Sequence, residues 1–243
     1  IDFDYASSDA ITLGNTIGNG FTQITCSAWV NLSTTELANN SRYRNFLVKF
    51  NGTALGPFEL RGNHARGDSG NNKLFFRVAT DTGSYGFTDT GFAFTEADKW
   101  YHIVGTYDGS NVKTFVDGIE RSSISANGTL VSNSDNATIG FDTSTGGFDG
   151  KISNASIFNT ALSQDQILTI YNGGVPNDIS SLSPVGWWSL AGDSYYNGTN
   201  FICPDLSSNS NNGTSSGMGG TELVGNGPGS TANGIATSMN IPE

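Results

Sequence analysis

Apolar side chains recur at alternate positions in several short segments of the chain. In residues 24–30, ITCSAWV, an apolar residue stands at every second position, which is typical of a strand with one face on a core. Clusters of Gly, Asn, Asp and Ser separate such segments. The predicted strands are residues 21–32, 45–50, 73–79, 100–107, 112–116 and 151–158. This pattern predicts an all-β chain of short strands and tight turns.

Two Asp-Gly pairs, at residues 108–109 and 117–118, follow two of these strands directly. Asp-Gly is favoured in hairpin turns, because the turn needs positive φ and glycine has no Cβ. The pairs therefore predict a meander of three strands. Residues 100–107 carry bulky side chains on both faces, so we expect two packed sheets.

One segment, ALSQDQILTIYNGG at residues 161–174, has the features of a helix. Ser163 is placed as N-cap, with Gln166 three residues later to complete a capping box. The apolar residues Ile167, Leu168 and Tyr171 are expected to cover one side of it. We interpret this helix as structural, lying across a sheet edge.

The composition changes after this helix. Residues 175–184 resemble a connector, and later stretches are rich in Ser, Asn and Gly. The segments PVGWWSL and NFICPDL nevertheless carry enough aromatic and aliphatic residues to dock as strands, because a solvated tail rarely exposes two adjacent tryptophans. We expect residues 175–243 to be an extension that docks on the sandwich or on a neighbouring subunit.

Composition and charge narrow the classes of partner. Of the 243 residues 36% are hydrophobic and 14% are charged, and the formal net charge is −11. Such a charge repels phosphate backbones and anionic lipid, so nucleic-acid and membrane-surface binding are excluded on electrostatic grounds. No apolar run is long enough to span a bilayer. Because the sequence begins at Ile1 without a leader, we expect a processed or truncated start.

Cys26 and Cys203 are too few for a disulfide scaffold and lack the spacing of a zinc or redox motif. Two alternatives stay open, a disulfide between them and two buried free thiols. The second is favoured, since free cysteine packs as a small hydrophobe.

Three motifs in order, FTQITCSAWV, KWYHIVGTYDGSNVKTFVDG and FDGKISNASIFNTALSQDQILTIYNGG, resemble laminin G-like domains of the concanavalin A-like lectin/glucanase superfamily. The resemblance covers about residues 1–174 and implies a jelly-roll sandwich of two antiparallel sheets. The last motif is also similar to pentraxins.

The extension adds a second resemblance. Its stretch VGWWSLAGD is similar to one that often precedes the first strand in this family. We therefore expect a permuted fold, in which residues 185–243 supply edge strands beside residues 1–13 of the same chain or of a neighbour. The whole layout also resembles structural proteins of tailed bacteriophages.

Catalytic motifs are absent from the sequence. Superfamily glucanases align carboxylates along one strand, whereas this chain offers only Glu96 and Asp98 before a turn. Neither His64 nor His102 belongs to a recognisable catalytic arrangement. The sequence predicts a protein that is not an enzyme.

Acidic loops leave a cation site open. Hard cations favour loop carboxylates, and Asp135, Asp142 and Asp149 lie in such loops. In pentraxins the segment that resembles FDTSTGG is rich in acidic and amide ligands, whereas this chain keeps only Asp142 there. No cofactor is required; a structural calcium ion at Asp142 or Asp149 is the alternative to simple turn chemistry.

Glycan binding combines aromatic platforms with groups that hydrogen-bond to hydroxyls. Trp29 and Trp100 are assigned to the core or to packing between the sheets. The candidate glycan-binding residues lie in loop-like regions and are Tyr43, Asn63, Tyr85 and Phe87.

These observations predict a non-enzymatic structural and attachment module on a virion or other extracellular surface, such as a capsid decoration, fibre or tail-associated protein. Its expected partners are other structural subunits or itself, in an oligomer or lattice, and cell-surface glycan. The alternative function is a carbohydrate-binding module of a secreted polysaccharide-degrading system.

Overall fold

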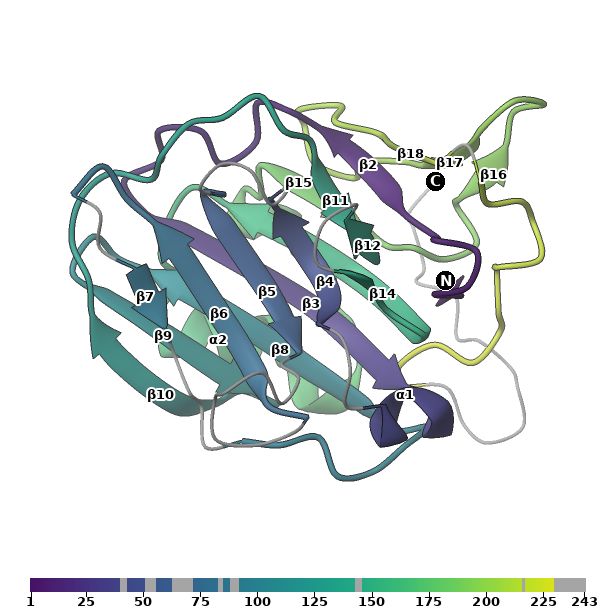
Figure 1. Ribbon diagram of the computed structural model, residues 1–243, viewed down its shortest axis with the longest axis horizontal. Helices are drawn as coiled ribbons and strands as arrows, with labels where there is room; N and C mark the ends of the chain where they lie inside the picture. The colour runs from purple at the N-terminus through teal and green to yellow at the C-terminus, as the bar shows by residue number, and fades with distance from the viewer. Residues whose placement is uncertain are drawn as a thin grey trace.

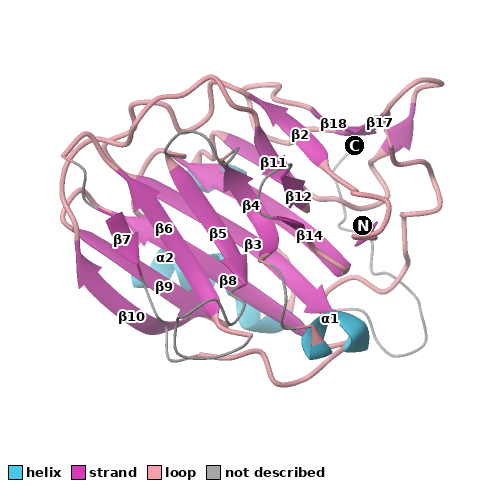
Figure 2. Cartoon of the chain, in the orientation of Figure 1, coloured by secondary structure: helices cyan, strands magenta, loops and turns pink. Residues whose placement is uncertain are grey.

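Two antiparallel sheets face each other in the computed structural model (Figure 1). The structure describes residues 1–39, 43–50, 56–62, 72–82, 85–87, 92–142, 146–215 and 217–229, without the side chains of residues 85–87 and 142. Strands dominate the cartoon and helices are short (Figure 2). The all-β, two-sheet prediction is confirmed.

Sheet A has the strand order β1-β14-β3-β8-β9-β10, and β15 pairs with β14 beside β1. Its strands are β1 (Asp2–Phe3), β3 (Ile24–Leu32), β8 (Trp100–Tyr107), β9 (Asn111–Val116), β10 (Ile119–Ser125), β14 (Gly150–Phe158) and β15 (Gly186–Trp188). Strands β8, β9 and β10 form the predicted meander. Asp117 and Gly118 make its second turn with φ of 52° and 76°, the positive values that a two-residue hairpin turn requires.

Sheet B has the strand order β16-β17-β18-β2-β11-β4-β5-β6-β7. Its strands are β2 (Ile11–Gly14), β4 (Arg44–Lys49), β5 (Phe58–Gly62), β6 (Leu74–Ala79), β7 (Tyr85–Phe87), β11 (Ala137–Ile139), β16 (Tyr195–Tyr196), β17 (Phe201–Cys203) and β18 (Gly213–Ser215). A separate hairpin of β12 (Phe141–Asp142) and β13 (Gly146–Gly147) contacts β4.

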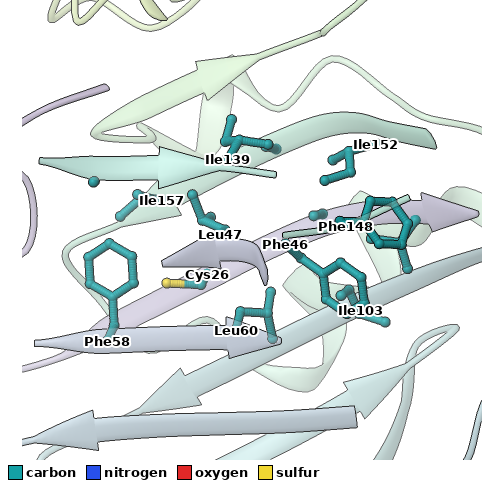
Figure 3. Packing of buried hydrophobic residues seen from close by; sticks show 14 of the residues in the cluster. Cys26, Phe46, Leu47, Phe58, Leu60, Ile103, Ile139, Phe148, Ile152 and Ile157 are labelled. Atoms are coloured by element: carbon teal, nitrogen blue, oxygen red, sulfur yellow. The ribbon is translucent and has the colours of Figure 1, made fainter. Parts of the chain in front are cut away.

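Apolar side chains from both sheets fill the space between them. Figure 3 shows Phe46 and Phe148 in this core, with ring centroids 5.1 Å apart in an edge-to-face contact. Gly105 in β8 lets the sheets approach, because a Cβ there would lie 2.2 Å from the Phe76 ring. Cys26 and Cys203 are buried free thiols, as the favoured reading predicted.

Helix α2 (Gln164–Tyr171) covers the outer face of sheet A. The capping box of Ser163 and Gln166 is present. Its buried residues are Ile167 and Ile170, whereas Leu168 is 46% exposed, so the prediction that Leu168 belongs to the buried side is wrong. The other helical segments are α1 (Thr34–Ala38), η1 (Asn172–Gly174) and η2 (Ser180–Leu182).

The region that follows α2 contributes strands to both sheets of the same chain. In sheet A, Trp188 of β15 lies opposite Ala155. In sheet B, Thr214 of β18 lies opposite Thr12 of β2. The described part of residues 175–243 therefore pairs with β14 and with β2 of its own chain, and the domain boundary after residue 174 stays a prediction.

Candidate functional site

A row of charged side chains crosses the outer face of sheet B. In β5, Phe58 and Leu60 belong to the core, so Glu59 and Arg61 alternate onto the outer face. In β6, Arg77 lies directly opposite Glu59 in the strand register. Residues opposite each other on antiparallel strands share a face, so the three charges form one row.

Glu59 makes ion pairs with both arginines of this row. Its Oε2 lies 2.6 Å from Arg61 Nη1, and its Oε1 lies 3.3 Å from Arg77 Nε. The side chains are 1% exposed at Glu59, 5% at Arg61 and 13% at Arg77. Charges with so little solvent around them are weakly screened, and Arg77 is the member closest to water.

Aromatic rings hold the two guanidinium groups. The Arg61 Cζ lies 4.0 Å from the ring centroid of Tyr43 and 5.1 Å from that of Phe75. The Arg77 Cζ lies 5.5 Å from the Phe50 centroid. A guanidinium over an aromatic face gains cation–π attraction and keeps its N–H edges in a fixed plane.

The hairpin of β12 and β13 borders this face. Asn45, which lies opposite Arg61 in the strand register, donates from its Nδ2 to the Gly146 carbonyl oxygen at 2.6 Å. Beside this hairpin, the rings of Tyr5 and Phe141 lie 6.4 Å apart, and Tyr5 is 38% exposed. The exposed ring of Tyr5, from the N-terminal segment, therefore packs beside this hairpin.

The structure places the predicted glycan-binding residues unevenly. Tyr43 belongs to the charged face, under Arg61. Tyr85 and Phe87 begin and end β7, where Phe87 lies opposite Arg77 in the backbone register; their side chains lie outside the described part. Asn63 lies outside the described residues altogether. The assignment of these four residues stays a prediction.

Sequence reasoning missed Glu59, Arg61 and Arg77. A signal was present, because FELRG and LFFRVA place charges within otherwise apolar strands. A buried charge at such a position destabilises the fold unless an opposite charge pairs with it. Two such strands next to each other in the chain are therefore a pointer to a paired polar face.

Of the two predicted metal ligands, the structure describes the side chain of Asp149 alone. Asp142 forms β12, but its side chain is outside the described part. Asp149 is half-buried and its carbonyl oxygen accepts from the Ser33 backbone N–H at 3.5 Å. Among the side chains described, no three from His, Cys, Asp and Glu gather where they could hold a metal ion. Calcium at Asp142 or Asp149 stays a prediction.

The outer face of sheet A contains a serine–histidine pair. Ser27 Oγ lies 2.9 Å from His102 Nε2, and both residues are 0% exposed. Desolvation lowers the pKa of His102 to about 3, so the imidazole is neutral at physiological pH. Neither side chain reaches the molecular surface, and the His102 ring packs against Trp29 and Tyr171.

Two tryptophans also lie on this outer face, so of the two predicted placements, the core or packing between the sheets, the second is wrong, while Trp29 is buried at 2% exposure. The Trp29 ring stacks on Tyr171 of α2 with centroids 5.8 Å apart. Trp100 is half-buried, and its indole Nε1 donates to the Asn226 carbonyl oxygen at 3.0 Å. Both lie on the face opposite Tyr101 and Val30, which point into the core.

The helices of the described residues are short. Helix α2 has eight residues, and none in the described ranges is long and apolar enough to cross a membrane.

Solved structures with a similar fold include sugar-binding domains. A protein of Bacteroides ovatus ATCC 8483 with a proposed carbohydrate-binding role has a TM-score of 0.60 and 18% identity, over 84% of this chain and 55% of that one. This chain therefore spans little more than half the length of that protein.

Two further similar structures contain a bound oligosaccharide. The CBM40 of Ruminococcus gnavus IT-sialidase, bound to α2,3 sialyllactose, has a TM-score of 0.54 and 16% identity over 70% of this chain and 95% of that one. Domain 4 of AbnA, an extracellular GH43 arabinanase of Geobacillus stearothermophilus, was solved in complex with arabinotriose. It has a TM-score of 0.52 and 18% identity, over 67% of this chain and 72% of that one. At these identities the likeness establishes the fold.

No curated protein sequence matches this chain. A family model does match, over residues 5–168, which is more than half of the chain. That model describes the region that forms most of both sheets and helix α2. The chain belongs to the Laminin_G_3 family of the concanavalin A-like lectin/glucanases superfamily.

Proposed function

We propose that this chain is a non-enzymatic glycan-binding module and that its ligand binds on the outer face of sheet B. The observation that carries the proposal is the row of Glu59, Arg61 and Arg77 beside the Tyr43 ring. Sugar sites combine aromatic surface with a few well-placed polar groups. The bound oligosaccharides of the similar CBM40 and arabinanase domains support the same class of ligand.

The burial of each side chain suggests a division of roles. Arg77 and Tyr43 are the more exposed members and would touch the sugar. Glu59 and Arg61 are almost fully buried and would act as positioning residues that hold the other two. Guanidinium N–H groups donate to sugar hydroxyl and ring oxygens, while the Tyr43 ring supplies a surface for C–H groups.

The test is a glycan array with the purified chain, followed by calorimetric titration of the best oligosaccharide. We expect Arg77→Lys to weaken binding about tenfold, because lysine keeps the charge but loses the planar fork of donors. Tyr195→Ala, at the exposed β16 strand, is the control and should bind as the parent chain does. Equal affinity of the parent and the Arg77→Lys variant would refute the proposed site.

The finer proposal is that the module is displayed on an extracellular surface, as part of a virion or similar assembly. Its support is the resemblance to phage structural proteins, together with an exposed edge strand β16, whose Tyr195 and Tyr196 are 52% and 53% exposed. The alternative, a module of a secreted polysaccharide-degrading system, is supported by the arabinanase and sialidase domains of similar fold.

Sizing of the purified chain separates these two settings. An assembly subunit should form oligomers through such an edge, whereas a module of a secreted system should bind oligosaccharide as a monomer. A monomer with tight affinity for a defined glycan would overturn the virion proposal and leave the glycan-binding proposal standing.

A further inference from the structure

A second group of polar side chains crosses four strands at one end of sheet A. The strand register places Asp2 opposite Lys151, Lys151 opposite Asn31, and Asn31 opposite Trp100. Because directly opposite residues share a face, these four form one row on β1, β14, β3 and β8. Their neighbours Val30, Tyr101 and Ile152 are in the core, so the row lies on the outer face. We call these four residues the end row.

Asn31 is the unusual member of the end row. It is only 3% exposed, yet its Oδ1 has no hydrogen-bond partner within the described part of the chain. Two positions earlier on the same face, Trp29 is 2% exposed and its Nε1 also has no partner there. A buried polar atom without a partner costs about 1–3 kcal/mol. Two such atoms on one strand face call for an explanation, and ordered water and a bound ligand are the two sources of the missing hydrogen bonds.

The C-terminal described segment borders the end row. The Asp2 backbone N–H donates to the Glu222 carbonyl oxygen at 2.8 Å, and Trp100 Nε1 donates to the Asn226 carbonyl oxygen at 3.0 Å. Strands β1 and β8 are three strand spacings apart, about 14 Å, a distance within reach of the four Cα–Cα steps from Glu222 to Asn226. In Figure 1 this segment, in yellow, runs along the end of the sandwich beside α1.

Helix α2 limits the same area on its other side. Its last residue, Tyr171, stacks on Trp29 and His102, the residues next to the end row along β3 and β8. Gly229 lies close to Val175, which follows α2 in the chain. A Cβ built at Gly229 would be 3.1 Å from the methyl groups of Val175. The end row therefore lies between the C-terminal segment and the end of α2.

We propose that the end row is a second ligand site, which takes a single sugar ring. The Asn31 amide offers both a donor and an acceptor, Lys151 adds donors and Asp2 adds acceptors. Trp100 adds an aromatic face, of the kind that packs against apolar C–H groups. A sugar ring presents hydroxyl groups, which donate and accept, together with a C–H face, and so matches the whole set. The site does not depend on the outer face of sheet B.

The test uses ¹⁵N–¹H NMR of the full chain, titrated with methyl glycosides of glucose, galactose, mannose and arabinose at millimolar concentrations. The signals followed are the Trp100 indole N–H, assigned by its loss in Trp100→Phe, and the Asn31 side-chain amide, assigned by its loss in Asn31→Leu. We expect at least one glycoside to shift both signals in a saturable manner. If no glycoside moves either signal, the proposal is overturned.

The Asn31→Leu variant separates a binding role from a structural one. It removes the unpartnered amide, so we expect a higher midpoint of thermal unfolding together with a loss of affinity of at least tenfold, read from the Trp100 signal. Tyr196→Ala, on strand β16 of sheet B, is the matched control and should titrate as the parent chain does. An Asn31→Leu variant that binds as tightly as the parent would contradict the proposal. Arg77→Lys should leave this titration unchanged, so a failure of the sheet B site is distinguishable from a failure here.

Discussion

The outer faces of the two sheets are formed by the same alternation of side chains but have opposite chemistry. On sheet A the outward residues Phe115 and Phe158 join Ile167 and Ile170 of α2 in a second apolar cluster. On sheet B the outward residues include the charged row of Glu59, Arg61 and Arg77. The apolar cluster gains stability from burial. Burial of the charged row costs free energy, because its charges lose their hydration.

This difference teaches that the part of sheet A beneath α2 serves folding, and we propose that the charged row on sheet B serves a ligand. The hydrogen bond between Ser27 and His102 resembles part of a catalytic arrangement, yet Tyr171 of α2 stacks on His102 and both residues of the pair are 0% exposed. A buried ion pair adds little net stability in general, because the cost of desolvating both charges offsets their mutual attraction. Our proposal assigns this costly polar face to ligand binding.

The largest expected effect is a pH dependence of the free energy of unfolding, which arises from His102 beneath α2. The pKa of His102 is lowered to about 3 from 6.5, so the unfolded chain takes up a proton that the folded chain rejects. The free energy of unfolding should therefore fall as the pH drops from about 6.5 to about 3, by up to about 5 kcal/mol in all. Urea unfolding over this pH range measures it.

The matched variant for this prediction is His102→Phe, which keeps a ring beside Trp29 and Tyr171 but cannot take up a proton. Its free energy of unfolding should fall less steeply below pH 6.5. Parallel pH curves for the parent and the variant would show that His102 is not the group responsible.

The next effect concerns the charged row. Glu59→Gln should lower the free energy of unfolding by about 3–5 kcal/mol, because it removes the charge that compensates two largely buried guanidinium groups. The control is Glu120→Gln, which breaks an exposed pair with Lys113 and should cost less than about 1 kcal/mol. Equal losses in the two variants, measured by urea unfolding, would mean that the row is solvated.

A smaller loss in the free energy of unfolding is expected for a change in the apolar cluster beneath α2. Ile167→Ala should lower the free energy of unfolding by about 3 kcal/mol through lost burial and the cavity left behind, while glycan affinity stays unchanged. Leu168→Ala is the control, since Leu168 is 46% exposed and surface changes cost about 0.5 kcal/mol or less. A change in glycan affinity with Ile167→Ala would break the distinction between the two faces.

The smallest effect is on binding itself. Tyr43→Ala should weaken glycan affinity by about 1 kcal/mol, or fivefold, because the ring that stacks under Arg61 and faces the sugar is lost. Tyr43→Phe keeps the ring and should retain most of the affinity in calorimetric titration. If Tyr43→Phe loses as much as Tyr43→Ala, the hydroxyl and not the ring surface is the important group.

Much of the fold could be predicted from local pattern. The expected strand at residues 100–107 is observed unchanged as β8, and the Asp117-Gly118 turn has the expected positive φ values. The capping box at Ser163 is also observed. These features depend on neighbours in the sequence. The buried side of α2 was harder, because Ile170 and not Leu168 meets the sheet, and that depends on how the helix is set on the strands.

The charged face could not be assembled from the sequence in the same way. Glu59 and Arg77 lie 18 positions apart, and only the pairing of β5 with β6 makes them opposite. Tyr43 was identified by its residue type, but its place under Arg61 depends on the same register. Periodicity indicates which residues share a face of one strand, whereas a site depends on the register between strands.

A crystal structure of the chain with the best-binding oligosaccharide tests the central claim most directly. The account predicts a sugar on the outer face of sheet B, in contact with the Tyr43 ring and the Arg77 guanidinium group. A ligand that touches neither of these residues, in a complex of full occupancy, would contradict it.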